Sequence, residues 1–312
     1  MIKIKNYING KLSESLDNEY LNVFNPSTGM IYAQCPNSSK NDLNSAIKSS
    51  GKSFSQWSKL KQNERGEFLF SIADLIEKNM DEFANAESMD NGKPYNLSKS
   101  LDIPRSIKNL RFFASLANSI EPESYHKENV VSHILKQPLG IVGTISPWNL
   151  PLYLFTWKIA PALVSGNCVI AKPSEITPYT AYLLSKICIE AGIPKGVLNI
   201  LHGDGKTIGR EIVRHNKIKA ISFTGGTKTG KEIARESSNS LKKINLEMGG
   251  KNPVIIFDDC DYNIMMNSLL KSSFLNQGQI CLSGSRIYVQ KTLYKKFRDD
   301  FIKKDKKICL GR

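Results

Sequence analysis

A chain of 312 residues with 40% hydrophobic and 23% charged residues has the composition of a globular protein with room for about two domains. It contains no apolar run long enough to cross a membrane, and the start "MIKIKNYING" turns polar too early for a secretory signal, so we expect a cytoplasmic protein. The net charge of +14 comes largely from lysines spread along the whole chain, which indicates solvated faces rather than a nucleic-acid-binding or membrane-binding patch.

Cysteine and histidine spacing gives no sign of a disulfide framework or of a metal site. The chain has six cysteines and four histidines. No two cysteines are spaced as CxxC, and no histidines have the HExxH spacing of a zinc-binding helix. We therefore expect neither structural disulfides nor a bound metal.

The segment from residue 40 to residue 120 is predicted to be mostly helical. Apolar side chains recur every three or four positions in 68–90 and again in 103–116, which is the spacing of an amphipathic helix. The polar stretch 121–130 contains a proline and ends this run. We assign 122–139 to an extended segment.

From Gly140 onward, short apolar runs alternate with helical patterns. The runs are "GIVGTIS", "NCVIAK", "VLNIL", "KAISFT" and "INLEM". Apolar strands separated by helices predict an α/β fold with a doubly wound parallel sheet, in which ligands bind beyond the carboxyl ends of the strands. The segments after these strands are polar or rich in glycine, as a binding crevice requires.

Two of these segments have glycine spacings that suggest a nucleotide. Gly203, Gly205 and Gly209 follow one strand, with one residue more than the usual dinucleotide pattern, so an ordinary turn is an equal alternative. After the next strand, Gly225 and Gly226 permit close backbone approach, and we expect Thr227 to cap a helix whose amides face a phosphate.

Charged side chains follow two further strands. Lys172 and Glu175 are spaced to hold ribose hydroxyls, and a surface ion pair is the alternative. Glu247 ends an apolar strand, where most carboxylates are solvated and idle. A partly buried one would have a raised pKa and would serve as a base.

The cysteine in "FLNQGQICLSGS" lies among small, polar and glycine residues. An inert buried cysteine is a good description of Cys168 and Cys188, which stand in apolar surroundings, but a poor one of Cys281. A free thiol has a pKa of ~8.5, so a nucleophilic cysteine needs surroundings that favour the thiolate.

Six segments in one order resemble the aldehyde dehydrogenase superfamily. They are "SPWN", "AKPSE", "GDGKTIG", "FTGGTKTG", "LEMGGKNP" and "NQGQIC", and the resemblance covers essentially the whole chain. It implies NAD as cofactor, a small aldehyde as substrate, and oxidation to the carboxylic acid through a cysteine thiohemiacetal and a thioester.

The resemblance implies a role for each matching residue. Cys281 corresponds to the nucleophile, Asn149 to the oxyanion-hole amide and Glu247 to the general base. Family members commonly have serine where Gly226 stands. With glycine at this position, the chain lacks one side-chain contact to phosphate. The implied cofactor-binding residues are Ile145, Ser146, Pro147, Trp148, Lys172, Ser174, Glu175, Gly205, Gly209, Phe223, Thr224, Gly225, Gly226, Thr227, Met248 and Gly249.

A narrower resemblance points to the substrate. "ISPWNLPLYLFTWKIAPAL", "ICLSGSRIYVQ" and "DIPRSIKNLRFF" are similar to the branch that acts on aminomuconic and hydroxymuconic semialdehydes. In that branch, the arginine matching Arg105 helps to hold the substrate carboxylate, a task that suits a guanidinium. The alternative for Arg105 is an ordinary arginine on a helix surface.

The sequence departs from the family pattern after Cys281, because it ends before the family's "EIFGP"-type motif. We expect a dinucleotide-binding domain in 1–247, with 122–139 as an oligomerisation-type segment, and the first part of a catalytic domain in 248–312. We expect a homo-oligomer for a full-length form but not for this chain, and no appreciable aldehyde oxidation by residues 1–312 alone. The alternative function is a catalytically inactive nucleotide-binding or interaction protein.

Overall fold

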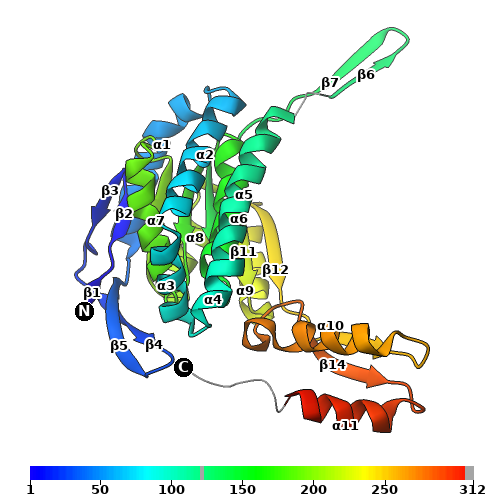
Figure 1. Cartoon of the computed structure of the whole chain (residues 1–312). Coiled ribbons are helices and arrows are strands. Elements are labelled where there is room, and N and C mark those ends of the chain that lie inside the picture. The colour runs from blue at the N-terminus through cyan, green and yellow to red at the C-terminus, as the bar shows by residue number, and fades with distance from the viewer. Residues whose placement is uncertain (120–122, 306–312) are drawn as a thin grey trace. The chain divides into compact units, whose positions relative to one another are not determined.

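The computed structural model describes residues 1–119 and 123–305, and it divides the chain into two compact units. The first unit is Met1–Glu247 and the second is Met248–Arg312. Figure 1 identifies the helices and strands of both units along the chain.

A seven-stranded sheet forms the centre of the first unit, in the order β12-β11-β8-β9-β10-β2-β3. Strands β11, β8, β9 and β10 pair with one another in parallel, whereas β2 is antiparallel to both β10 and β3. Every residue of β8 and β9 is buried, because both faces of the sheet are covered. The strands are β2 Asn6–Ile8, β3 Lys11–Ser13, β8 Ile141–Ile145, β9 Cys168–Lys172, β10 Leu198–Ile200, β11 Ile218–Gly225 and β12 Lys243–Met248.

The strand order reverses at β8. The chain runs from β8 outward to β9 and β10, then returns to the other side of β8 to form β11 and β12. Such a reversal opens a crevice beyond the carboxyl ends of the central strands, where ligands of doubly wound sheets bind. The expected α/β fold with a parallel sheet is confirmed, and the antiparallel edge is an addition to it.

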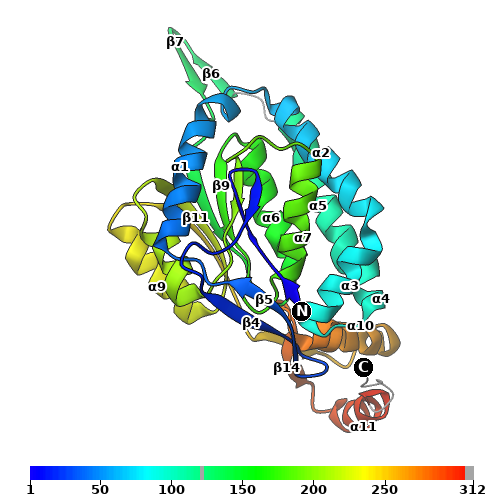
Figure 2. The same cartoon turned by 90° about the vertical axis from the view of Figure 1, so that its left-hand side faces the viewer.

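Helices cover both faces of this sheet, as Figure 2 shows. Helices α1, α8 and α9 lie on one face, and α6 and α7 lie on the other, where α2, α3 and α5 form a further layer outside them. The predicted helical segments are thus confirmed. The helices are α1 Lys40–Trp57, α2 Gln62–Lys78, α3 Met80–Asn91, α4 Tyr95–Leu97, α5 Ile103–Leu116, α6 Pro151–Val164, α7 Tyr179–Glu190, α8 Arg210–Arg214 and α9 Thr227–Ser238.

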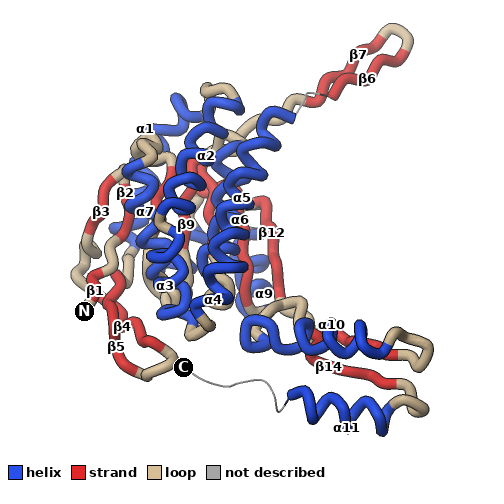
Figure 3. Tube along the Cα trace, in the orientation of Figure 1, coloured by secondary structure: helices blue, strands red, loops and turns tan. Residues whose placement is uncertain are grey.

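Two smaller sheets complete the first unit. One has the order β1-β5-β4, with strands Ile2–Lys3, Met30–Pro36 and Tyr20–Asn25, and its buried side chains pack with Tyr182 of α7. The other is a hairpin of β6 Glu123–Lys127 and β7 Val130–Ile134, in which every residue is exposed (Figure 3). This hairpin lies within the extended segment that the sequence predicts.

The second unit is a small α/β element with its own core. Its strands β13 Asn252–Ile256 and β14 Gly284–Val289 pair in parallel, joined by α10 Tyr262–Phe274 and followed by α11 Tyr294–Asp305. Ile256, Met266, Leu269 and Phe297 form the buried cluster. The parallel pair requires the crossover that α10 provides.

Candidate active site

The loop after β8 carries the first group of predicted site residues. Ile145 ends the strand. The backbone N–H of Ser146 donates to the carbonyl oxygen of Lys172 at 3.0 Å, so the hydrogen bonding between β8 and β9 extends one residue into the loop. Trp148 is partly exposed, and Asn149 precedes the first turn of α6 by two residues. Pro151 at the start of α6 suits a helix beginning, since its missing N–H would have no intrahelical partner.

Lys172 and Glu175 form an ion pair after β9. Lys172 is buried, and its Nζ contacts Glu175 Oε2 at 3.0 Å and the carbonyl of Pro173 at 3.1 Å. The Glu175 side chain is about one third exposed, so its carboxylate remains open on one side. Ser174 Oγ accepts a hydrogen bond from the N–H of Ile176 and thereby stabilises this turn. The lysine is thus not part of an ordinary surface pair.

The turn after β10 is closed by an aspartate. Asp204 accepts hydrogen bonds from the backbone N–H and the hydroxyl of Thr207 at 2.6 and 2.7 Å. Burial opposes ionisation of Asp204, but these bonds outweigh it and hold its pKa below the usual value. Gly205 and Gly209 bound the short helical turn that follows, and a side chain at Gly205 would meet open space.

The turn between β11 and α9 differs in one respect from the expectation. Gly226, not Thr227, is the N-cap residue of α9, and no side chain caps the helix. The prediction that Thr227 caps α9 is therefore wrong, because β11 continues to Gly225 and Thr227 already has helical geometry. A Cβ on Gly225 would lie 2.5 Å from the ring of Phe223, whereas one on Gly226 would meet no atom within 4 Å.

Glu247 is held by two side chains of the same unit. Thr224 Oγ1 donates to Glu247 Oε2 at 3.0 Å, and Lys158 Nζ lies 3.7 Å from Oε1. Burial lowers the pKa of Lys158, and the carboxylate of Glu247 opposes that shift. Lys158 and Glu247 line a hollow of about 410 Å³ formed by α5, β8, α6, β11 and β12. The Glu247 carboxylate is therefore anchored yet accessible.

Cys281 lies in the second unit and is exposed. It follows a turn in which Asn276, Gln277 and Gly278 have positive φ values of 52°, 56° and 69°, a conformation that costs energy for residues other than glycine. The side-chain amide of Asn252 donates to the backbone carbonyl of Cys281 at 2.6 Å, which fixes the loop from β13. Met248 and Gly249 begin this unit and are exposed.

The other cysteines have different surroundings. Cys35, Cys168 and Cys188 are buried, and desolvation raises the pKa of each thiol to about 12. Cys260 is half-buried, and Cys309 lies outside the described residues. Cys281 is thus the one exposed cysteine in the part of the chain that the structure describes.

Arg105 lies near the start of α5 and is exposed. Its Nη2 donates to the hydroxyl of Tyr153 at 3.2 Å, and its guanidinium lies 5.3 Å from the centre of the Tyr153 ring. No acidic partner within the described ranges forms an ion pair with it. Arg111 on the same helix is different, because Asp74 and Glu77 both bind it and raise its pKa.

The predicted cofactor-binding residues of the first unit lie at or directly after the carboxyl ends of β8, β9, β10 and β11, whereas Glu247 lies on β12 and Arg105 on α5. Lys158 was missed by sequence reasoning. Its signal is a single cation within the apolar run "YLFTWKIAPAL", a position where a lysine is buried and needs an acceptor. Asn252 was also missed, and only the folded loop reveals its contact with Cys281.

Comparison with known proteins establishes the family. The aldehyde dehydrogenase family model matches residues 13–312, and the chain belongs to this family. Among its relatives, human 2-aminomuconic semialdehyde dehydrogenase is 44% identical, and the match covers 100% of this chain and 64% of the human protein. A 2-hydroxymuconic semialdehyde dehydrogenase from a Pseudomonas species is 37% identical, with 95% of this chain and 63% of that protein covered.

Solved structures agree with this assignment. The NAD+ complex of an aldehyde dehydrogenase from Bacillus cereus superposes with a TM-score of 0.96 at 34% identity, over 99% of this chain and 64% of that one. Betaine aldehyde dehydrogenase from Staphylococcus aureus in complex with NAD+ gives 0.96 at 36% identity, over 100% and 62%. The chain therefore spans less than two thirds of the length of these relatives. Over the described ranges, no helix has both the length and the apolar character needed to span a bilayer.

Proposed function

We propose that this chain provides the nucleophile, the oxyanion donor, the base and the dinucleotide-binding surface for NAD-dependent oxidation of an aldehyde to a carboxylic acid. The observation that carries the proposal is the Glu247 carboxylate, which is anchored by Thr224 and Lys158 yet lines an open hollow. Membership of the aldehyde dehydrogenase family and the exposed thiol of Cys281 support the same reaction.

The residues at the carboxyl edge of the sheet are suited to NAD. The uncapped first turn of α9 and the open space at Gly226 would accept a phosphate close to backbone amides. Lys172 and Glu175 would hold the hydroxyls of the adenosine ribose, and the carboxylate of Glu175 would repel a 2′-phosphate, which favours NAD over NADP. The nicotinamide of the bound cofactor supplies the hydride acceptor.

The chain's own residues account for the remaining steps. The thiolate of Cys281 adds to the aldehyde carbon, and the carbonyl oxygen becomes an oxyanion that the Asn149 side-chain amide stabilises. After oxidation a thioester joins the substrate to Cys281. Glu247 removes a proton from water, the water oxygen attacks the thioester carbon, and the thiolate leaves as the acid forms. The buried ammonium of Lys158 would keep the Glu247 carboxylate oriented between cycles.

We further propose a substrate with a carboxylate, such as a muconic-type semialdehyde. Arg105 is stacked on Tyr153 and has no acidic partner among the residues described, so most of its N–H donors remain available. A guanidinium with free donors can bind a carboxylate in bidentate fashion. The relatives named for muconic semialdehydes support this choice.

The test is NADH formation at 340 nm with aliphatic aldehydes and a muconic-type semialdehyde, together with calorimetric titration of NAD and NADP. It is performed on the 312-residue chain and on the same chain joined to the part of the human relative beyond the match. We expect NAD to bind more tightly than NADP, and turnover that is abolished by Cys281→Ser. Arg105→Met should raise KM for the semialdehyde but not for the aliphatic aldehydes. Arg111→Met on the same helix should leave KM unchanged for both kinds of substrate. NAD binding without Cys281-dependent turnover in either form would favour an inactive nucleotide-binding protein.

A further inference from the structure

We propose that Lys93 and Asn91 are positioning residues that aim the Asn149 side chain by holding the backbone of the loop after β8. The inference rests on the oxyanion role proposed for Asn149. It concerns a buried polar cluster between α3, the segment after it, and the start of α6, in which Glu87, Asn91 and Lys93 belong to none of the sequence motifs.

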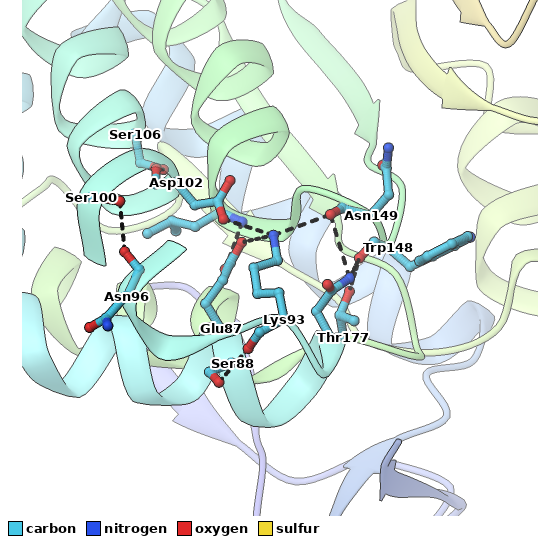
Figure 4. Close-up of polar contacts among 12 residues, drawn as sticks. Glu87, Ser88, Lys93, Asn96, Ser100, Asp102, Ser106, Trp148, Asn149 and Thr177 are labelled. Carbon is cyan, nitrogen blue, oxygen red and sulfur yellow. Dashed lines mark hydrogen bonds and ion pairs between the residues drawn. The ribbon is translucent and has the colours of Figure 1, made fainter. Parts of the chain in front are cut away.

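Lys93 is enclosed by three acceptors. Its side chain is 0% exposed, and its Nζ lies 2.8 Å from Asp102 Oδ2 and 3.6 Å from Glu87 Oε1. The same nitrogen donates to the backbone carbonyl of Asn149 at 3.3 Å, as the dashed lines in Figure 4 show. An ammonium removed from water needs all of these acceptors, so its position is closely fixed.

Asn91 holds the same stretch of backbone from the end of α3. Its side-chain amide donates to the carbonyl of Trp148 at 3.1 Å and to that of Asn149 at 3.4 Å. Thr177 donates to the Trp148 carbonyl at 3.3 Å from the segment before α7 (Figure 4). Two consecutive carbonyls are thus bound by three side chains, two from the end of α3 and the residues after it and one from the segment before α7.

The cluster also fixes the beginning of α6. Glu87 Oε2 accepts a hydrogen bond from the backbone N–H of Leu152 at 3.4 Å. The backbone around Asn149 is therefore held on both sides: Lys93 and Asn91 bind the carbonyls of Trp148 and Asn149, and Glu87 binds the N–H of Leu152 in the first turn of α6. Burial raises the pKa of Glu87 and of Asp102, and the charge of Lys93 opposes both shifts.

This arrangement has a consequence for catalysis. The direction of a short side chain such as that of Asn149 follows from its backbone dihedrals, and an oxyanion donor must be aimed at the developing charge to within a fraction of an ångström. The donors of Lys93 and Asn91 that bind these carbonyls are buried, so breaking either contact would leave a donor unsatisfied away from water, and the loop backbone is held in place. Lys93 and Asn91 would thus act through Asn149 without touching the substrate.

The first variant is Asn91→Asp, which keeps the shape of the side chain but removes both N–H donors. Its matched control is Asn199→Asp in β10, where a buried asparagine amide donates to the Gly196 carbonyl at 3.1 Å and to Ser50 at 2.9 Å. The second variant combines Lys93→Met with Asp102→Asn, so that Asp102 is not left as an unpaired buried carboxylate, while Glu87 loses its Lys93 partner and keeps the N–H of Leu152. The full 312-residue chain is used throughout.

Hydrogen exchange resolved by mass spectrometry decides the proposal without any assay of activity. We expect amides of residues 145–153 to exchange about tenfold faster in both Asn91 and Lys93 variants under conditions where global unfolding is negligible, and not in the Asn199 control. Unchanged exchange in 145–153, or an equal increase throughout the first unit, would overturn the proposal. If an urea titration shows that the Lys93 double variant is unfolded, the Asn91 variant and its control give the same decision.

A kinetic readout then separates the positioning role from the proposed function. In the form that turns over aldehyde, the Asn91 variant should lower kcat about tenfold with KM changed less than twofold, since the lost interaction acts at the transition state. An unchanged kcat despite faster local exchange would contradict a role in aiming Asn149. Absence of turnover in the parent chain would count against the proposed function, and the exchange result would still decide the role of Lys93 and Asn91.

Discussion

At the scale of single residues, accessibility separates the Cys281 thiol from the buried ones. Cys281 is exposed on a loop, whereas three thiols are enclosed and have a pKa of about 12. We expect iodoacetamide at a limiting dose to label Cys281 first, with peptide mass spectrometry as the measurement and Cys260 as the internal comparison. Labelling of Cys260 at the same rate would remove the support for a nucleophilic Cys281.

His202 makes the stability of the first unit sensitive to acid. The imidazole is fully buried, neither ring nitrogen has a hydrogen-bond partner among the described residues, and burial followed by the charge of Lys172 lowers its pKa to about 3. A lowered pKa means that the folded state binds the proton less well than the unfolded chain. The stabilising contribution is therefore complete above pH ~6.5 and is lost as the pH falls toward 3.

The variant His202→Leu tests this linkage. Between pH 7 and pH 4.5, the parent chain should lose about 2 to 3 kcal/mol of unfolding free energy through this group, and the variant should not. Urea unfolding followed by circular dichroism at several pH values measures the difference. Parallel pH profiles for the two chains would show that His202 does not titrate on unfolding in this range.

At the scale of elements, close packing of β8 depends on a glycine. A Cβ at Gly143 would lie 2.8 Å from Ile212 Cγ2 in α8 and 2.8 Å from Ile221 Cδ1 in β11. Gly143→Ala should therefore cost ~1–3 kcal/mol by overpacking. Gly51→Ala in α1 is the control, because that position faces open space and alanine is the better helix former by ~1 kcal/mol. Equal midpoints of thermal unfolding for both variants would contradict the packing argument.

The central strands could be predicted because their sequences carry the information locally. β8 and β9 are apolar runs between glycine, proline and helical patterns. β2 and β3 could not be predicted from the sequence, since they are three-residue strands in a polar segment and join the sheet through the pairing of Tyr7 with Ile200. Such long-range pairing depends on the folded core and leaves little trace in the local sequence.

At the scale of the whole molecule, the same distinction applies to the candidate site. The resemblance of six segments to the aldehyde dehydrogenase superfamily led to the roles of Asn149, Glu247 and Cys281, which stay predictions. Lys93 and Lys158 went unnoticed, because a buried lysine looks like any other in a chain of 43 basic residues. Their function depends on acceptors that only the fold brings near, including Glu247 for Lys158 and Asp102 for Lys93.

Trapping the acyl intermediate tests the central claim, oxidation of an aldehyde at Cys281, most directly. The variant Glu247→Gln lacks the base for thioester hydrolysis, so one round of oxidation should leave the acyl group on the enzyme. The chain, joined to the remainder of the human relative if the chain alone is inert, is mixed with NAD and a semialdehyde, quenched in acid and digested. We predict an acyl adduct on the peptide containing Cys281, dependent on NAD and absent after Cys281→Ser. No adduct, or one on another residue, would contradict the account.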